Sequence, residues 1–152
     1  SSMTQELKDQ LYPQLKEKIK NAPKLMAANI LLSWVQFGLV YALDEIVWGY
    51  DRPFFAEETL YYPFADCADR AVLYSQLVRD LLDLDVILVY NANPGLLYTA
   101  ICFDENMPGD YIMVNDRKFT IADPTYYGAN VGKTMSRMNN STAKVLLLNK
   151  QR

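Results

Sequence analysis

Cys67 is the residue whose position in this chain most suggests chemistry. It lies in Tyr62-Pro63-Phe64-Ala65-Asp66-Cys67-Ala68-Asp69-Arg70-Ala71, where a loop turns into an amphipathic helix. The free N–H groups and the dipole of a helix N-terminus stabilise a thiolate, whereas the neighbouring acidic side chains oppose it. The 152 residues contain no histidine, the usual base for such a thiol. The position therefore predicts either a nucleophile without its base or a small buried apolar side chain.

Asp123 opens a second segment of interest, Asp123-Pro124-Thr125-Tyr126, directly after a predicted strand. An aspartate before proline commonly starts a turn and by itself indicates no catalysis. A cysteine at a helix start, a pair of strands and then this segment make an order that resembles the transglutaminase-like branch of the papain fold. The resemblance covers residues 30–135 approximately. The segments that carry it are Tyr61-Tyr62-Pro63, Asp66-Cys67 with Asp69-Arg70, Asp110-Tyr111-Ile112 and Asp123-Pro124-Thr125-Tyr126.

The resemblance implies a fold and a set of roles. It implies an α+β domain in which the cysteine-bearing helix packs on an antiparallel sheet, with Cys67 as nucleophile and Asp123 as the residue that orients an imidazole. The histidine is expected directly after Pro94-Gly95, where this chain has Leu96. Leucine cannot take a proton, and loss of one member of such a unit removes most of its contribution to the rate. The resemblance thus implies that Cys67 and Asp123 are vestigial.

Other departures from the family pattern gather around the same residues. Small side chains surround the cysteine, and large apolar ones occupy the segments that would face it. Small residues on one wall and aromatic residues on the other are typical of a pocket for an apolar guest. The predicted pocket residues are Trp48, Ala65, Ala68, Ala71, Leu96, Tyr98 and Tyr127. We interpret these departures as engineered remodelling of an inactive scaffold that binds a small molecule, a metal complex or a grafted side chain; drift of a core after loss of activity is the other interpretation.

Three further functions remain open on the sequence. The chain is also consistent with a natural pseudoenzyme that binds peptides or cell-wall fragments in the same cleft. It is consistent with a residual hydrolase that uses Cys67 with a poor base. Residues 39–48 are apolar enough to serve instead as an exposed patch of a protein-interaction scaffold.

A cofactor is not predicted. Cys67 and Cys102 lack the spacing of zinc ligands, and the remaining candidates for a divalent metal are adjacent acidic residues. Neighbours in sequence do not face each other on a helix or strand, so neither pair is a ready chelate. The two pairs are Asp44 with Glu45 and Glu57 with Glu58.

Composition limits the class of protein. Hydrophobic residues make up 51% and charged residues 22%, and the net charge is −3, which argues against binding to nucleic acid. No apolar run reaches the roughly 18 residues of a membrane span. We therefore expect one soluble domain over residues 1–152, a monomer or weak homo-oligomer of undetermined compartment. Ser1-Ser2 is interpreted as a cloning remnant.

The elements that would position these residues follow from periodicity. Helical spacing predicts helices over 4–21, 23–40 and 67–82, and residues 41–65 are irregular. The third helix is expected to bury a stripe of Cys67, Ala71, Tyr74, Val78 and Leu81. The predicted strands are Val86–Tyr90, Leu97–Phe103, Tyr111–Val114, Lys118–Ile121 and Lys144–Leu148. Helices first and strands second predict an α+β fold with an antiparallel sheet.

Overall fold

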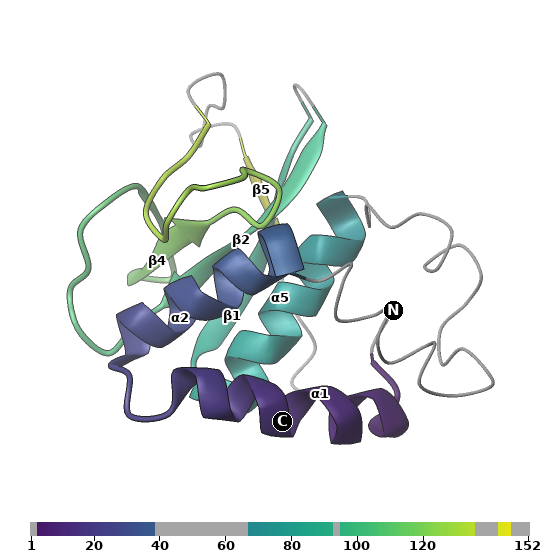
Figure 1. Cartoon of the computed structure of the whole chain (residues 1–152). Helices are drawn as coiled ribbons and strands as arrows, with labels where there is room; N and C mark the ends of the chain where they lie inside the picture. Colours follow the sequence, from purple (N-terminus) through teal and green to yellow (C-terminus); the bar gives the residue numbers. More distant parts are fainter. Residues whose placement is uncertain (1–2, 39–66, 93–94, 136–142, 147–152) are drawn as a thin grey trace.

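The computed structural model describes residues 3–38, 67–92, 95–135 and 143–146. Its helices are α1 (Gln5–Ile19), α2 (Lys24–Ser33), the π-helical turn η1 (Trp34–Gly38) and α5 (Cys67–Leu82). Its strands are β1 (Asp85–Asn91), β2 (Leu96–Cys102), β3 (Tyr111–Val114), β4 (Arg117–Ala122) and β5 (Lys144–Leu146). The strands form an antiparallel sheet in the order β3-β4-β2-β1-β5. The predicted α+β class is confirmed, with α1, α2 and α5 packed on a curled sheet (Figure 1).

α1 is held to the molecule by a stripe of leucines. Leu7, Leu11 and Leu15 recur every fourth residue and are all buried. The hydroxyl of Thr4 accepts a hydrogen bond from the backbone N–H of Leu7 at 3.2 Å and so caps the first turn. Burial of each leucine contributes about 1.5–3 kcal/mol, so packing stabilises this helix more than intrinsic propensity does.

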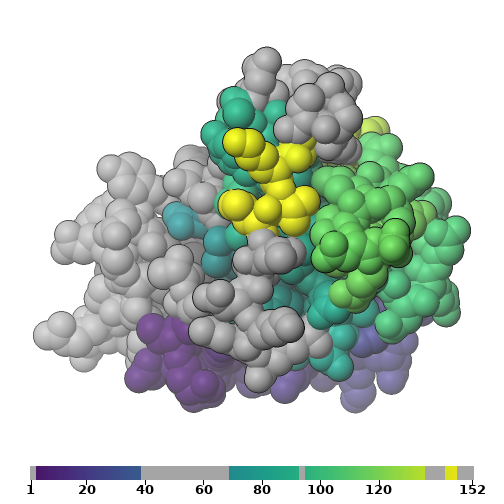
Figure 2. Space-filling view, turned by 180° about the vertical axis from the view of Figure 1, so that it is seen from behind, coloured from purple at the N-terminus to yellow at the C-terminus, as the bar shows by residue number. Residues whose placement is uncertain are grey.

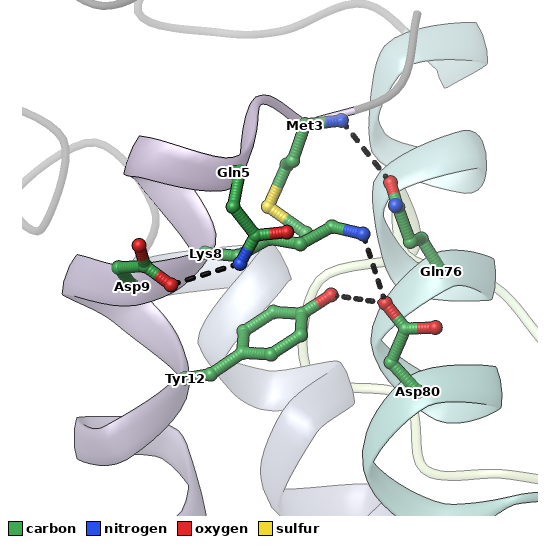
Figure 3. Close-up of polar contacts among 7 residues, drawn as sticks. All are labelled: Met3, Gln5, Lys8, Asp9, Tyr12, Gln76 and Asp80. Carbon is green, nitrogen blue, oxygen red and sulfur yellow. Dashed lines mark hydrogen bonds and ion pairs between the residues drawn. The ribbon is translucent and has the colours of Figure 1, made fainter.

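Polar contacts at the edge of this interface join α1 to α5 (Figure 3). The hydroxyl of Tyr12 donates to the carboxylate of Asp80 at 2.6 Å, and Nζ of Lys8 lies 3.5 Å from the same carboxylate. Burial raises the pKa of Tyr12, and the hydrogen bond and charge of Asp80 raise it further. The backbone N–H of Met3 donates to the side chain of Gln76 at 3.2 Å. These contacts fix where α1 begins relative to α5.

The second helix changes its geometry at Trp34. The sequence predicts a single helix over 23–40, whereas the α-helix ends at Ser33 and η1 continues it to Gly38; residues 39 and 40 lie outside the described part. A π-helical turn holds more residues than an α-helical one, so it shifts the following side chains around the axis. Val35 and Gln36, neighbours in sequence, are both buried. A polar amide thus enters the interior, which apolar periodicity does not predict.

α5 is the central helix, and its predicted bounds are confirmed. Its buried side chains include Ala71, Tyr74, Leu77, Val78 and Leu82. Leu81, which was expected in this stripe, is half-buried because Leu82 takes the inward position in the last turn. The hydroxyl of Tyr74 donates to the carbonyl of Ala28 at 2.8 Å, which ties α5 to α2. None of the described helices is long and apolar enough to cross a membrane.

The sheet separates two apolar cores. Val86, Ile101 and Ala122 pack with the buried residues of the helices in the first core. The second core consists of Ile87, Val89, Tyr98, Ala100, Phe119 and Ile121. Successive side chains of a strand point to opposite faces, so the parity of a residue number decides which core it joins. On β2, odd-numbered side chains lie on the face covered by α5 and even-numbered ones on the other face.

β5 completes one edge of the sheet. It pairs with Leu88–Tyr90 of β1, and Figure 2 shows it in yellow at the surface. The sequence predicts this strand to Leu148, but residues 147 and 148 lie outside the described part. The other four strands match their predicted ranges to within one residue at each end.

Candidate functional site

Cys67 is the first residue of α5, so the cysteine stands at a helix N-terminus as predicted. α5 contacts β1, β2 and α2. The side chains of Cys67 and Ala68 lie outside the described part, as do Trp48 and Ala65 altogether. The described site is therefore built from the segments around this end of α5.

The carboxylate of Asp123 is held out of water at the end of β4. Asp123 is 1% exposed, and its Oδ1 accepts hydrogen bonds from the backbone N–H of Thr125 at 2.9 Å and from its hydroxyl at 2.8 Å. Burial raises the pKa of Asp123, and the hydrogen bonds from Thr125 lower it in part. The Asp-Pro-Thr sequence forms the expected turn, and that turn fixes the orientation of the carboxylate.

Leu96 begins β2, which lies next to β4 in the sheet. Thr99 of β2 pairs with Ala122 of β4. Asp123 directly follows β4, and its charge raises the pKa of the Tyr98 phenol, so the carboxylate lies near Tyr98; Leu96 lies two residues before Tyr98 on the same face of β2. Diagonal neighbours across two strands are within reach of long side chains. A side chain longer than leucine at position 96 can therefore approach the carboxylate.

Tyr98 connects this acid to the second core. It is fully buried there. Burial raises the pKa of its phenol to about 12; a hydrogen bond with Asn91 lowers the pKa, and the nearby charge of Asp123 raises it. The charge of Asp123 thus lies close enough to affect the phenol of Tyr98.

Gln36 of η1 holds the loop that follows β4. Its Nε2 donates to the carbonyl oxygens of Asp123 at 3.1 Å, Tyr126 at 2.9 Å and Ala129 at 3.1 Å. Its Oε1 accepts from the backbone N–H of Gly128 at 3.1 Å. The side chain is 4% exposed, so water does not compete for these bonds. One amide therefore fixes four backbone groups of the loop that carries Asp123.

Arg70, in the first turn of α5, joins this helix to η1. It is 3% exposed, and its Nη1 donates to the carbonyls of Val35 at 2.6 Å and Gln36 at 3.2 Å. Carbonyl groups at a helix C-terminus favour a cation. The guanidinium carbon lies 5.6 Å from the ring centroid of Tyr127, which lies 5.4 Å from that of Phe37. Arg70 thus stabilises the contact between α5, η1 and the loop after β4.

The described residues of the predicted pocket have different surroundings. Ala71 is buried on α5, and Tyr98 is buried in the core on the face away from that helix. Tyr127 is 52% exposed beside Arg70, and Leu96 is half-buried at the start of β2. The predicted cavity also includes side chains outside the described part, so the pocket stays a prediction.

Sequence reasoning missed Gln36 and gave Arg70 no role of its own. A signal for Gln36 was present. Asn29 and Gln36 are amide residues seven positions apart in a mostly apolar helix, a spacing that returns to the same helix face after two turns. Asn29 also holds the loop, because its Oδ1 accepts from the backbone N–H of Val131 at 2.7 Å. Two amides at this spacing in a mostly apolar helix are thus a signal of polar contacts made by that helix.

Metal ligation was expected only at adjacent acidic residues. Asp44, Glu45, Glu57 and Glu58 all lie outside the described part. Within the described part, there is no group of three or more His, Cys, Asp or Glu side chains that could hold a metal ion.

The buried acid predicts a pH dependence of stability. Because folding raises the pKa of Asp123, the folded state favours its protonated form, and stability is lost as the pH rises from the unfolded pKa through the folded one. Asp123→Asn keeps an oxygen for both hydrogen bonds from Thr125 and removes the charge. We expect this variant to be more stable than the parent at pH 7 and nearly equal at pH 3, by urea unfolding at both pH values. A variant less stable than the parent at pH 7 would contradict the argument.

The described arrangement can hold an oriented carboxylate beside a phenol, with a buried guanidinium at the adjoining helix end. A carboxylate so placed can orient and stabilise a cation such as an imidazolium. Comparisons of the chain with protein-family models, curated proteins and solved structures found no match.

Proposed function

We propose that this chain is a transglutaminase-like domain of the papain fold that has lost its general base and binds an apolar guest in the former active-site cleft. The observation that carries the proposal is the carboxylate of Asp123, which is buried, oriented by Thr125 and close enough to Tyr98 of β2 for its charge to raise the pKa of that phenol. A buried carboxylate costs stability, and such costs persist at sites with a functional history. An inherited enzyme site would account for a buried carboxylate at this position.

The chemistry of this site favours binding over catalysis. With no histidine in the chain, no imidazole can take the proton of Cys67. Leucine in its place presents apolar surface, which suits a small molecule, a metal complex or a grafted side chain. The absence of histidine from all 152 residues supports an engineered origin, because histidine competes for metals and protons.

The proposed roles of position 96 and Asp123 are tested by introducing the missing histidine. Leu96→His introduces the chain's single histidine, so NMR titration reports one imidazole. In Leu96→His, the carboxylate of Asp123 is expected to keep the imidazole pKa about one pH unit or more above its value in the double variant Leu96→His/Asp123→Asn. Equal values in the two variants would overturn the carried-over roles.

Loss of catalysis is tested at the thiol. Cys102→Ser removes the other cysteine, so alkylation by iodoacetamide as a function of pH reports Cys67 alone. We expect a thiol pKa near that of free cysteine, about 8.5, in this background. A strongly lowered pKa without the histidine would overturn the proposal in favour of a residual thiol hydrolase.

The proposed binding of an apolar guest is tested separately. A dye that fluoresces in apolar cavities is expected to bind the folded parent, and Leu96→Lys is expected to weaken that binding about tenfold or more by placing a charge in the cleft. A folded parent that does not bind the dye, or a lysine variant that binds equally well, would overturn the pocket.

A further inference from the structure

Gln36 is bound to its loop in a way that only a side-chain amide allows. Three loop carbonyls accept from its Nε2, two of them in addition to a backbone N–H, and the N–H of Gly128 donates to its Oε1. A carboxylate cannot donate and an ammonium cannot accept, whereas an amide does both. The partners also fix which end of the amide is nitrogen, because a carbonyl oxygen would repel three other oxygens. The interior of this loop is therefore built around a glutamine.

The same residue also contacts the helix that begins with Cys67. The backbone carbonyl of Gln36 accepts from Arg70 of α5, while its side chain donates to the backbone carbonyl of Asp123. Gln36 thus contacts the cysteine-bearing helix with its backbone and the acid-bearing loop with its side chain. Gln36 lies in the π-helical turn η1, and such turns occur frequently at functional sites.

We infer that Gln36 is a positioning residue, which sets the place of Asp123 relative to the N-terminus of α5 and to position 96. The inference rests on the proposed function, because the place of Asp123 matters chemically only if a group at position 96 interacts with it. A loop held only at its ends would let the carboxylate shift, whereas bonds to Asp123, Tyr126, Gly128 and Ala129 hold it along its length.

The test measures the imidazole pKa in the Leu96→His background. Gln36→Met keeps the length of the side chain and removes its hydrogen bonds. It is expected to lower the imidazole pKa by about half a pH unit or more, because the carboxylate of Asp123 no longer stays near position 96. Gln36→Asn, which keeps the amide but is one carbon shorter, gives the same readout where the methionine variant does not fold.

Asn29→Ala is the matched control. Asn29 comes from the same helical segment and holds the same loop, but at Val131, beyond the part that carries Asp123. It is expected to lower stability without moving the imidazole pKa. A pKa that moves equally in the Asn29 and Gln36 variants would show general loosening of the loop and overturn the positioning role.

The two proposals fail in different ways. If Asp123→Asn leaves the imidazole pKa unchanged, the proposed function fails. If Asp123→Asn lowers the pKa but both Gln36 variants, when folded, leave it unchanged, the positioning role of Gln36 is overturned and the proposed function stands.

Discussion

Arg70→Met is expected to lower the free energy of unfolding by about 3–4 kcal/mol, one of the two largest effects that we predict for a single substitution. Arg70 is 3% exposed, and its guanidinium donates to the carbonyls of Val35 and Gln36. Hydrogen bonds from a charged group contribute more than neutral ones, and buried acceptors without a donor cost further free energy. Methionine fills a similar volume, so the loss reports polar contacts rather than a cavity.

The chain offers a matched control in Arg117. Its Nη2 lies 2.7 Å from the carboxylate of Asp85, but both side chains are about half exposed, at 50% and 49%. Exposed ion pairs contribute about 0–1 kcal/mol, so Arg117→Met is expected to change stability little. Urea unfolding of both variants checks the contrast. Equal losses would show that burial of Arg70 is not the source of its contribution.

Elements with a regular pattern could be predicted from the sequence, and those that depend on contacts between elements could not. α5 and β3 have their predicted bounds because apolar spacing and flanking turn residues define them locally. The change from α2 to η1 at Trp34 has no local signal. It is stabilised by distant partners of Gln36 in the loop after β4, which a reading of residues 23–40 does not include.

The sequence predicts the order of the site residues along the chain but not the sheet face on which each side chain lies. Asp123 could be expected at the end of a strand, because Asp-Pro ends strands and starts turns. That β2 and β4 are neighbours, with Leu96 and Tyr98 on the same face of β2, follows from strand order and register. A shift of the register by one residue would move every side chain of a strand to the other face. Sequence alone therefore did not decide in which core Tyr98 lies.

Gly109→Ala is expected to have the other largest effect, a loss of about 3–5 kcal/mol in the free energy of unfolding. A Cβ at Gly109 would lie 2.6 Å from the Cα of Gly132, closer than such atoms approach, and the φ of Gly109 is +109°. Backbone cannot rotate aside as a side chain can, so one of the two segments must move. Movement would break the hydrogen bonds from Asp110 N–H to the Gly132 carbonyl, at 2.7 Å, and from Gly132 N–H to the Ile121 carbonyl, at 2.6 Å.

Gly128→Ala separates steric overlap from backbone strain. Its φ is +84°, but a Cβ there would meet nothing within 4 Å, so the expected cost is only the strain of a left-handed residue, about 1–2 kcal/mol. Unfolding of both variants in urea gives the comparison. If Gly109→Ala costs no more than Gly128→Ala, close approach of the two backbones is not a constraint on the fold. If it costs more, close approach of the two backbones constrains the loop at Gly132, whereas Gln36 holds the same loop at Asp123.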